Sequence, residues 1–190
     1  MVAIAITLLI LPLVDAAGTL GTRGVGPFLD TNRDRLFAFT LSFAVIGLFW
    51  WGHHRMFEKV KAYNSMLAWG LFIWLFSIVF LPFPTELLGS AKSNNVEAHA
   101  IYVSTMLVTA IGALVQQWAI VKWPELQDEA HRGEMNTDGA LVLTVLMGAS
   151  LLVVIAVPAV GLWSLLGLLL SRPIEHLLAA RRTRRAHTGR

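Results

Sequence analysis

Long apolar blocks without charge alternate with short charged segments along the chain. A bilayer hydrocarbon core is ~30 Å thick, so a helix needs ~20 mostly apolar residues to cross it. Several blocks meet or approach this length. They lie at residues 1–16, 36–52, 66–81, 97–121, 139–157 and 160–170. The pattern predicts an all-α fold, a polytopic membrane helical bundle with about six transmembrane helices.

Polar residues and prolines mark the ends of the third block. Residues 53–61 are expected to form a polar connector before it. Asn64 is predicted to cap its helix, because an asparagine side chain can accept a hydrogen bond from the first turn. Pro82 and Pro84 should end the helix, since proline removes a backbone donor and clashes with the preceding turn. A loop is then expected over residues 88–95.

The last block, 160–170, is too short to cross a bilayer alone. Pro158 either ends or kinks the fifth helix, so the sixth span is tilted or joined to the fifth as one bent element. We expect a transmembrane domain over residues 1–171 and a basic cytoplasmic tail over residues 172–190.

The placement of Lys and Arg predicts the orientation, because cytoplasmic loops are enriched in these residues. If both termini are cytoplasmic, the outer segments hold only four of the 15 Lys and Arg residues: Arg23, Arg33, Arg35 and Lys92. We therefore expect a multi-pass protein of the cell membrane with both termini in the cytoplasm. The tail supplies six of the inner charges, so five spans with an external N-terminus would also fit.

Composition narrows the possible functions. The chain is 56% hydrophobic, 14% charged and free of cysteine, which excludes disulfides, thiolate metal sites and a cysteine nucleophile. The net charge of +3 comes mostly from the tail, so no nucleic-acid partner is expected. Composition alone also leaves open that the first block is a signal peptide.

Residues 41–88 and 1–12 carry a family resemblance. The first segment has Trp50 and Trp51 before His53-His54-Arg55 and ends its third helix in Leu-Pro-Phe-Pro. It resembles the second and third spans of the transmembrane-protein-175 family of potassium channels. Residues 1–12, MVAIAITLLILP, resemble the pore helix of that family. The resemblance implies a potassium channel rather than an enzyme, a homotetramer in the lipid bilayer with the first helix around the axis, and no cofactor.

Ile4, Leu8 and Leu11 share one face of the first helix, since they follow the i, i+4, i+7 spacing. By resemblance these positions line the pore, where four copies would form stacked apolar rings. Hydrophobic constrictions serve as gates in channels. Because the whole segment is apolar, periodicity alone would also allow this face to meet lipid. Asp15, at the outer end, either attracts cations or is an ordinary solvated helix end.

The family's pore helix opens with Arg-x-x-x-Phe-Ser-Asp, and the alignment would place that Asp about two residues before Met1. Either the start codon has been assigned too late or the chain is a truncated paralogue. We expect the motif in frame in the upstream DNA. The implied partners of this motif at the inner end of the second helix are Trp50 and His54, which lie four residues apart and share a face.

His53 and His54 are not expected to bind a metal together, because adjacent residues on a helix point about 100° apart. Trp50 and Trp51 would alternatively serve as interfacial belt residues, and Gln116 and Gln117 are expected at the membrane interface. Two other functions remain open. One is a non-conducting membrane scaffold, and the other is a membrane redox protein that uses a histidine.

Overall fold

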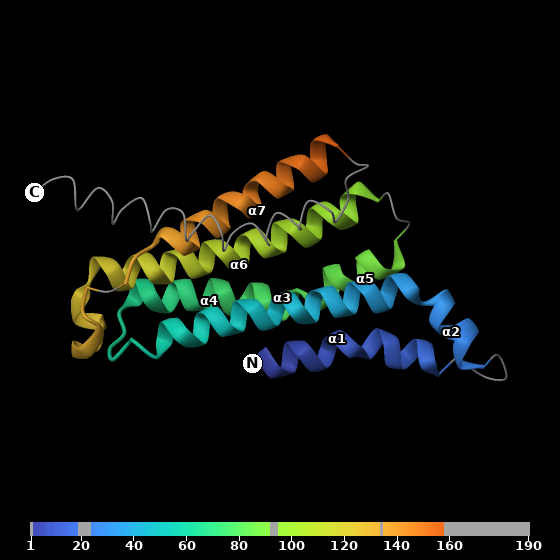
Figure 1. Cartoon of the computed structure of the whole chain (residues 1–190), viewed down its shortest axis with the longest axis horizontal. Helices are drawn as coiled ribbons and strands as arrows, with labels where there is room; N and C mark the ends of the chain where they lie inside the picture. Colours follow the sequence, from blue (N-terminus) through green and yellow to red (C-terminus); the bar gives the residue numbers. More distant parts are fainter. Residues whose placement is uncertain (1, 19–23, 92–94, 134, 158–190) are drawn as a thin grey trace, which may run out of the picture.

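A computed structural model describes residues 2–18, 24–91, 95–133 and 135–157. These segments are almost entirely helical (Figure 1). The α-helices are α1 (Val2–Ala17), α2 (Val25–Thr31), α3 (Arg33–Phe57), α4 (Ser65–Phe80), α5 (Pro82–Ser90), α6 (Val96–Lys122) and α7 (Asp138–Ala156). Two short 3₁₀ turns follow α6, η1 (Pro124–Leu126) and η2 (Glu129–His131).

The helices lie side by side in one bundle, with α7 packed on α6 at one edge and α1 packed on α3, α4 and α5 at the other (Figure 1). In the described part, four helical stretches are long and apolar enough to cross a membrane: α3, α4 with α5, α6 and α7. The apolar helix α1 is shorter. The predicted all-α membrane bundle is confirmed, while the sixth block and the basic tail lie outside the described residues.

The second and third helices differ from the prediction at their ends. Helix α3 continues to Phe57, so His53, His54 and Arg55 are helical and the polar connector begins later. The prolines do end α4 at Phe80, but α5 starts at once, at Pro82. Proline is compatible with the first position of a helix, where its missing N–H has no partner to lose. Asn64 caps α4 as predicted, accepting a hydrogen bond from Leu67 N at 2.8 Å.

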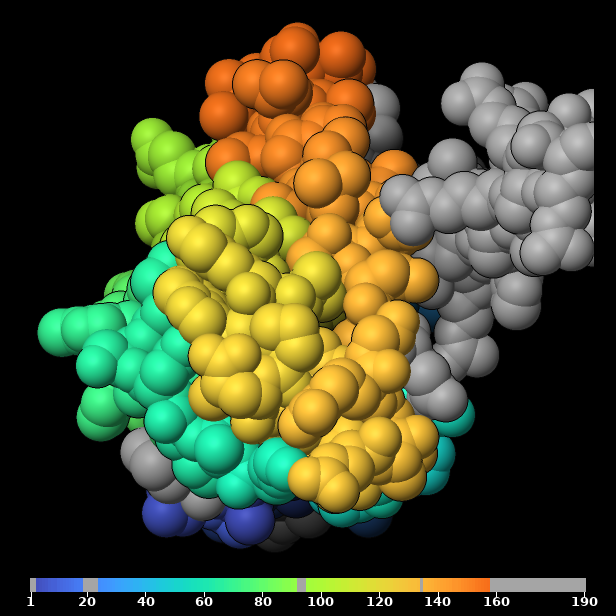
Figure 2. All heavy atoms as spheres, turned by 90° about the vertical axis from the view of Figure 1, so that its left-hand side faces the viewer, coloured from blue at the N-terminus to red at the C-terminus, as the bar shows by residue number. Residues whose placement is uncertain are grey.

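The connectors at residues 58–64 and 123–137 meet at one end of the bundle, called here the connector end. Lys61 N donates to Leu126 O at 2.9 Å, and Asp128 N donates to Lys59 O at 2.9 Å. Both loops cover this end of the molecule (Figure 2). A six-span topology requires these two connectors to share one side of the membrane, and they meet at one end of the bundle.

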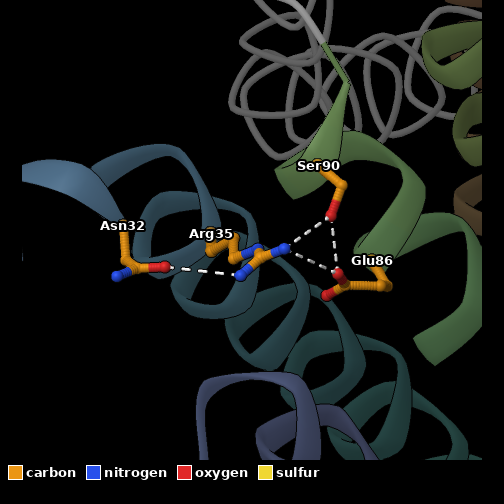
Figure 3. A network of polar contacts seen from close by, with 4 residues as sticks. All are labelled: Asn32, Arg35, Glu86 and Ser90. Carbon is orange, nitrogen blue, oxygen red and sulfur yellow. Dashed lines mark hydrogen bonds and ion pairs between the residues drawn. The ribbon is translucent and has the colours of Figure 1, made fainter. Parts of the chain in front are cut away.

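A polar cluster ties the start of α3 to α5 at the opposite end (Figure 3). One Arg35 nitrogen donates to Ser90 Oγ at 3.2 Å and lies 3.6 Å from a Glu86 oxygen, and another donates to Asn32 Oδ1 at 3.4 Å. Gly89 allows this approach, since a Cβ there would lie 3.0 Å from Arg35 Cα. The cluster holds α5 against α3, and α5 in turn contacts α1.

Candidate functional site: the outer face of α1

Helix α1 has a buried face and an exposed face. Ala5 and Leu9 are buried in the main apolar core. On the exposed face, Ile4, Leu8 and Leu11 are 58%, 44% and 51% exposed in the single chain. These three residues lie within about 60° of one another around the helix, at 100° per residue. They therefore form a straight apolar stripe that points away from the core of their own chain.

The same stripe continues to the end of the helix at Asp15, which is exposed and lies four residues beyond Leu11. The one hydroxyl in this part of α1, on Thr7, donates to Ile4 O at 2.8 Å. Its hydrogen is therefore used within the helix. The described stripe is a hydrocarbon surface with a single carboxylate at one end.

Trp50 and His54 share a face of α3, as their spacing predicts. Their rings stack with centroids 5.3 Å apart and an interplanar angle of 5°. Both side chains are exposed in the single chain. His54 Nε2 lies 3.3 Å from a carboxylate oxygen of Glu58. The two rings are therefore already in contact on the outer surface of α3, near the connector end.

His53 points the other way, into the bundle. Its ring stacks on Trp74 of α4 at a centroid distance of 4.0 Å and on Phe57 at 4.4 Å. The two neighbouring histidines are therefore separated by the helix, as the 100° rotation predicts. Among the described residues, no group of three or more His, Asp or Glu side chains is placed to hold a metal ion.

Gln116 is buried inside the bundle. Its side chain is 0% exposed, and its amide donates to Gly70 O at 3.2 Å and Gly112 O at 3.1 Å. Gly70 leaves room for the Gln116 side chain, and Gly112 lets α6 approach the backbone of α4 at Trp74. Sequence reasoning passed over Trp74 and the burial of Gln116, although a polar amide four residues after a glycine in an apolar helix is a signal of close helix packing.

The bundle consists of long apolar helices, and its few buried polar side chains face inward. The chain is therefore an all-α integral membrane protein. Residues 1–82 match the family described as endosomal/lysosomal potassium channel TMEM175. The resemblance predicted from the Trp, His-His and Leu-Pro-Phe-Pro positions is therefore confirmed over this part of the chain, which contains α1, α3 and α4.

Two bacterial proteins named potassium channel are also similar to the chain. The protein from Chryseobacterium sp. (strain P1-3) is 28% identical over 122 residues, and the one from Streptomyces collinus (strain DSM 40733 / Tue 365) is 29% identical over 129 residues. These alignments cover 63% and 66% of this chain. The chain spans 59% and 62% of the lengths of these relatives.

Proposed function

We propose that this chain forms a potassium-permeable channel in the cell membrane, as a homotetramer with α1 of each copy around the axis. The observation that carries the proposal is the exposed apolar stripe of α1, which lies about 110° around the helix from its buried face. The TMEM175 match over residues 1–82 and the names of the relatives support a channel rather than an enzyme. In this arrangement the stripe of each copy faces its counterparts.

The stripe suits a hydrophobic constriction. Four copies of Ile4, Leu8 and Leu11 form three stacked rings that offer an ion no replacement ligands. An ion must then shed part of its water shell to pass. Potassium holds its water less tightly than sodium and loses less free energy in the process, so hydrocarbon rings favour potassium modestly. Asp15 lies at one mouth of this path, where carboxylate rings favour cations.

Trp50 and His54 are proposed to support the pore helix. Their stacked, exposed face is available to contact a neighbouring copy or a segment that packs beside α1. With the connectors and the N-terminal end of α1 in the cytoplasm, this contact lies at the inner end of the pore. Potassium ions and lipid are the only partners that the proposal requires besides the other three copies.

Replacing Ile4 by asparagine in the full chain is expected to weaken the preference for potassium over sodium. An amide at the ring supplies oxygen ligands that replace lost water and lower the penalty for sodium. Reversal potentials in planar bilayers with potassium on one side and sodium on the other would measure the change.

Ile10→Asn is the matched control for this experiment. Ile10 is also an exposed isoleucine of α1, but it lies about 120° around the helix from Ile4. Its substitution should leave the reversal potential near that of the parent chain. Equal reversal potentials for the parent and Ile4→Asn would show that Ile4 does not line the constriction.

The scaffold and redox alternatives give different results on the same purified protein. A scaffold would show no potassium flux when reconstituted in liposomes loaded with a potassium-sensitive dye. A histidine-dependent redox protein would show a haem-type absorption band. Potassium flux without such a band is the result expected for a channel.

A further inference from the structure

Among the described residues, four buried polar atoms have no hydrogen-bond partner: Nδ1 of His131 in η2 is one of them, and the other three lie in α3, α4 and α6. These three are Nε1 of Trp74, Oε1 of Gln116 and Nε2 of His53. Trp74 and Gln116 are 1% and 0% exposed. A buried donor or acceptor left unsatisfied loses its hydration without a replacement bond, so three of them require a physical explanation.

The His53 side chain of α3 contacts both Trp74 of α4 and Gln116 of α6. His53 and Trp74 are stacked, with a centroid distance of 4.0 Å and an interplanar angle of 17°. The Gln116 side chain lies against His53, within the range of a hydrogen-bonding contact. The two groups nevertheless miss the geometry of a direct hydrogen bond, since both atoms stay unpartnered.

The orientation of the Gln116 amide is determined by its other contacts. Its nitrogen faces the carbonyl oxygens of Gly70 and Gly112. Both are acceptors, so an amide turned the other way would place three oxygens together without a hydrogen. The oxygen of Gln116 must therefore face His53 and act as an acceptor there.

A direct bond between His53 and Gln116 would not satisfy the cluster. The indole nitrogen of Trp74 only donates, and the amide oxygen of Gln116 only accepts, while a neutral imidazole nitrogen does either. Rotating His53 to donate to Gln116 would give His53 Nε2 and Gln116 Oε1 a hydrogen-bond partner and leave the Trp74 N–H without one. A group that both accepts and donates is needed to complete all three.

We propose that one water molecule is bound between Trp74, Gln116 and His53. It accepts a hydrogen bond from Trp74 Nε1–H and donates to Gln116 Oε1 and His53 Nε2, with the imidazole proton on Nδ1. Buried waters typically make about three hydrogen bonds, which matches this set. The water joins α3, α4 and α6 by a polar link that no direct pair of these side chains can make.

Two of the three side chains lie near helix ends at the connector end. His53 lies one turn before the end of α3 at Phe57 and is half-buried. Gln116 lies less than two turns before the end of α6 at Lys122. His53 and Gln116 therefore lie near the level at which the connectors leave the bundle, and Trp74 lies nine positions after Ser65, the first residue of α4.

The site can be tested on the full chain in lipid nanodiscs with ¹⁵N-labelled tryptophan. Trp74→Phe identifies which of the seven indole signals belongs to Trp74. In the parent protein this indole proton is expected to show a cross-peak to water. Gln116→Leu should abolish that cross-peak, because it removes an acceptor of the water. The matched control Gln117→Leu, at the half-buried neighbouring position, should retain it.

A high-resolution experimental structure of the unmodified chain gives a second measurement that needs no variant. Density for one water within hydrogen-bonding distance of all three atoms would support the site. A direct bond from His53 to Gln116 with no water beside Trp74 would overturn it. So would a lipid or detergent headgroup in that position, or a Trp74 indole proton whose cross-peaks lead to acyl chains alone.

Discussion

Gly112→Ala is expected to force α4 and α6 apart and to lower the free energy of unfolding by ~1–3 kcal/mol, the usual cost of overpacking. A Cβ at residue 112 would lie 2.9 Å from the backbone nitrogen of Trp74 and 3.1 Å from its Cα. Backbone atoms cannot rotate away as a side chain can. The helix pair must separate, which also disturbs the Gln116 contact between them.

Thermal unfolding in detergent, followed by loss of the monodisperse chromatographic peak, measures this effect. Gly47→Ala on α3 and Gly148→Ala on α7 are the controls, because a Cβ at either position meets nothing within 4 Å. Since alanine favours helix over glycine by up to ~1 kcal/mol, these variants should unfold at the parent temperature or above it. If Gly112→Ala behaves like them, the close packing of α4 on α6 is not required.

Ser42→Ala is expected to destabilise the chain more than Tyr102→Phe does. The hydroxyls of Ser42, Thr85 and Tyr102 are buried in a chain that joins α3, α5 and α6. Ser42 Oγ lies 2.8 Å from Thr85 Oγ1 and 2.9 Å from the Tyr102 hydroxyl oxygen. Thr85 Oγ1 donates to Leu81 O at 2.8 Å.

The hydrogen bond from Thr85 to Leu81 determines which group donates in the other two hydrogen bonds. A carbonyl cannot donate, so the Thr85 hydrogen is used on Leu81, the Ser42 hydrogen on Thr85 and the Tyr102 hydrogen on Ser42. Removing the Ser42 hydroxyl leaves the Tyr102 donor buried without an acceptor, at a cost of ~1–3 kcal/mol. Removing the Tyr102 hydroxyl leaves every remaining donor satisfied, so the loss should be smaller.

Midpoints of thermal unfolding for the two single variants and the double variant test this order. In the double variant the orphaned donor is gone, so it should be less destabilised than the sum of the singles. Ser104→Ala, which removes a hydroxyl bonded to Ile101 O of its own helix at 2.9 Å, should have little effect. A larger loss for Tyr102→Phe than for Ser42→Ala would reverse the proposed direction of donation.

Several features of the fold follow from local sequence. The apolar blocks predict α1, α3, α4, α6 and α7 because a spanning helix must satisfy its own backbone hydrogen bonds. Asn64 predicts the start of α4, since capping depends on residues within one turn. The end of α3 and the start of α5 were predicted less well, because polar residues after a span and a proline pair are both compatible with helix.

The sequence predicted the stripe of the candidate site, but it did not predict which histidine of α3 turns into the bundle. The spacing of Ile4, Leu8 and Leu11 places them on one helix face in any structure that keeps α1 helical. Which of the two adjacent histidines turns inward depends on where α4 lies relative to α3. The position of Trp74 beside His53 decides this, and Trp74 is 21 positions further along the chain.

The sequence by itself determined that this is a helical membrane protein, because backbone hydrogen bonding and bilayer thickness act on each segment separately. It also determined the shared face of the candidate pore residues. Only the tertiary structure decided that this face points away from the core and that Gln116 is buried between two glycines. Those facts depend on how helices distant in sequence pack together, which local periodicity does not encode.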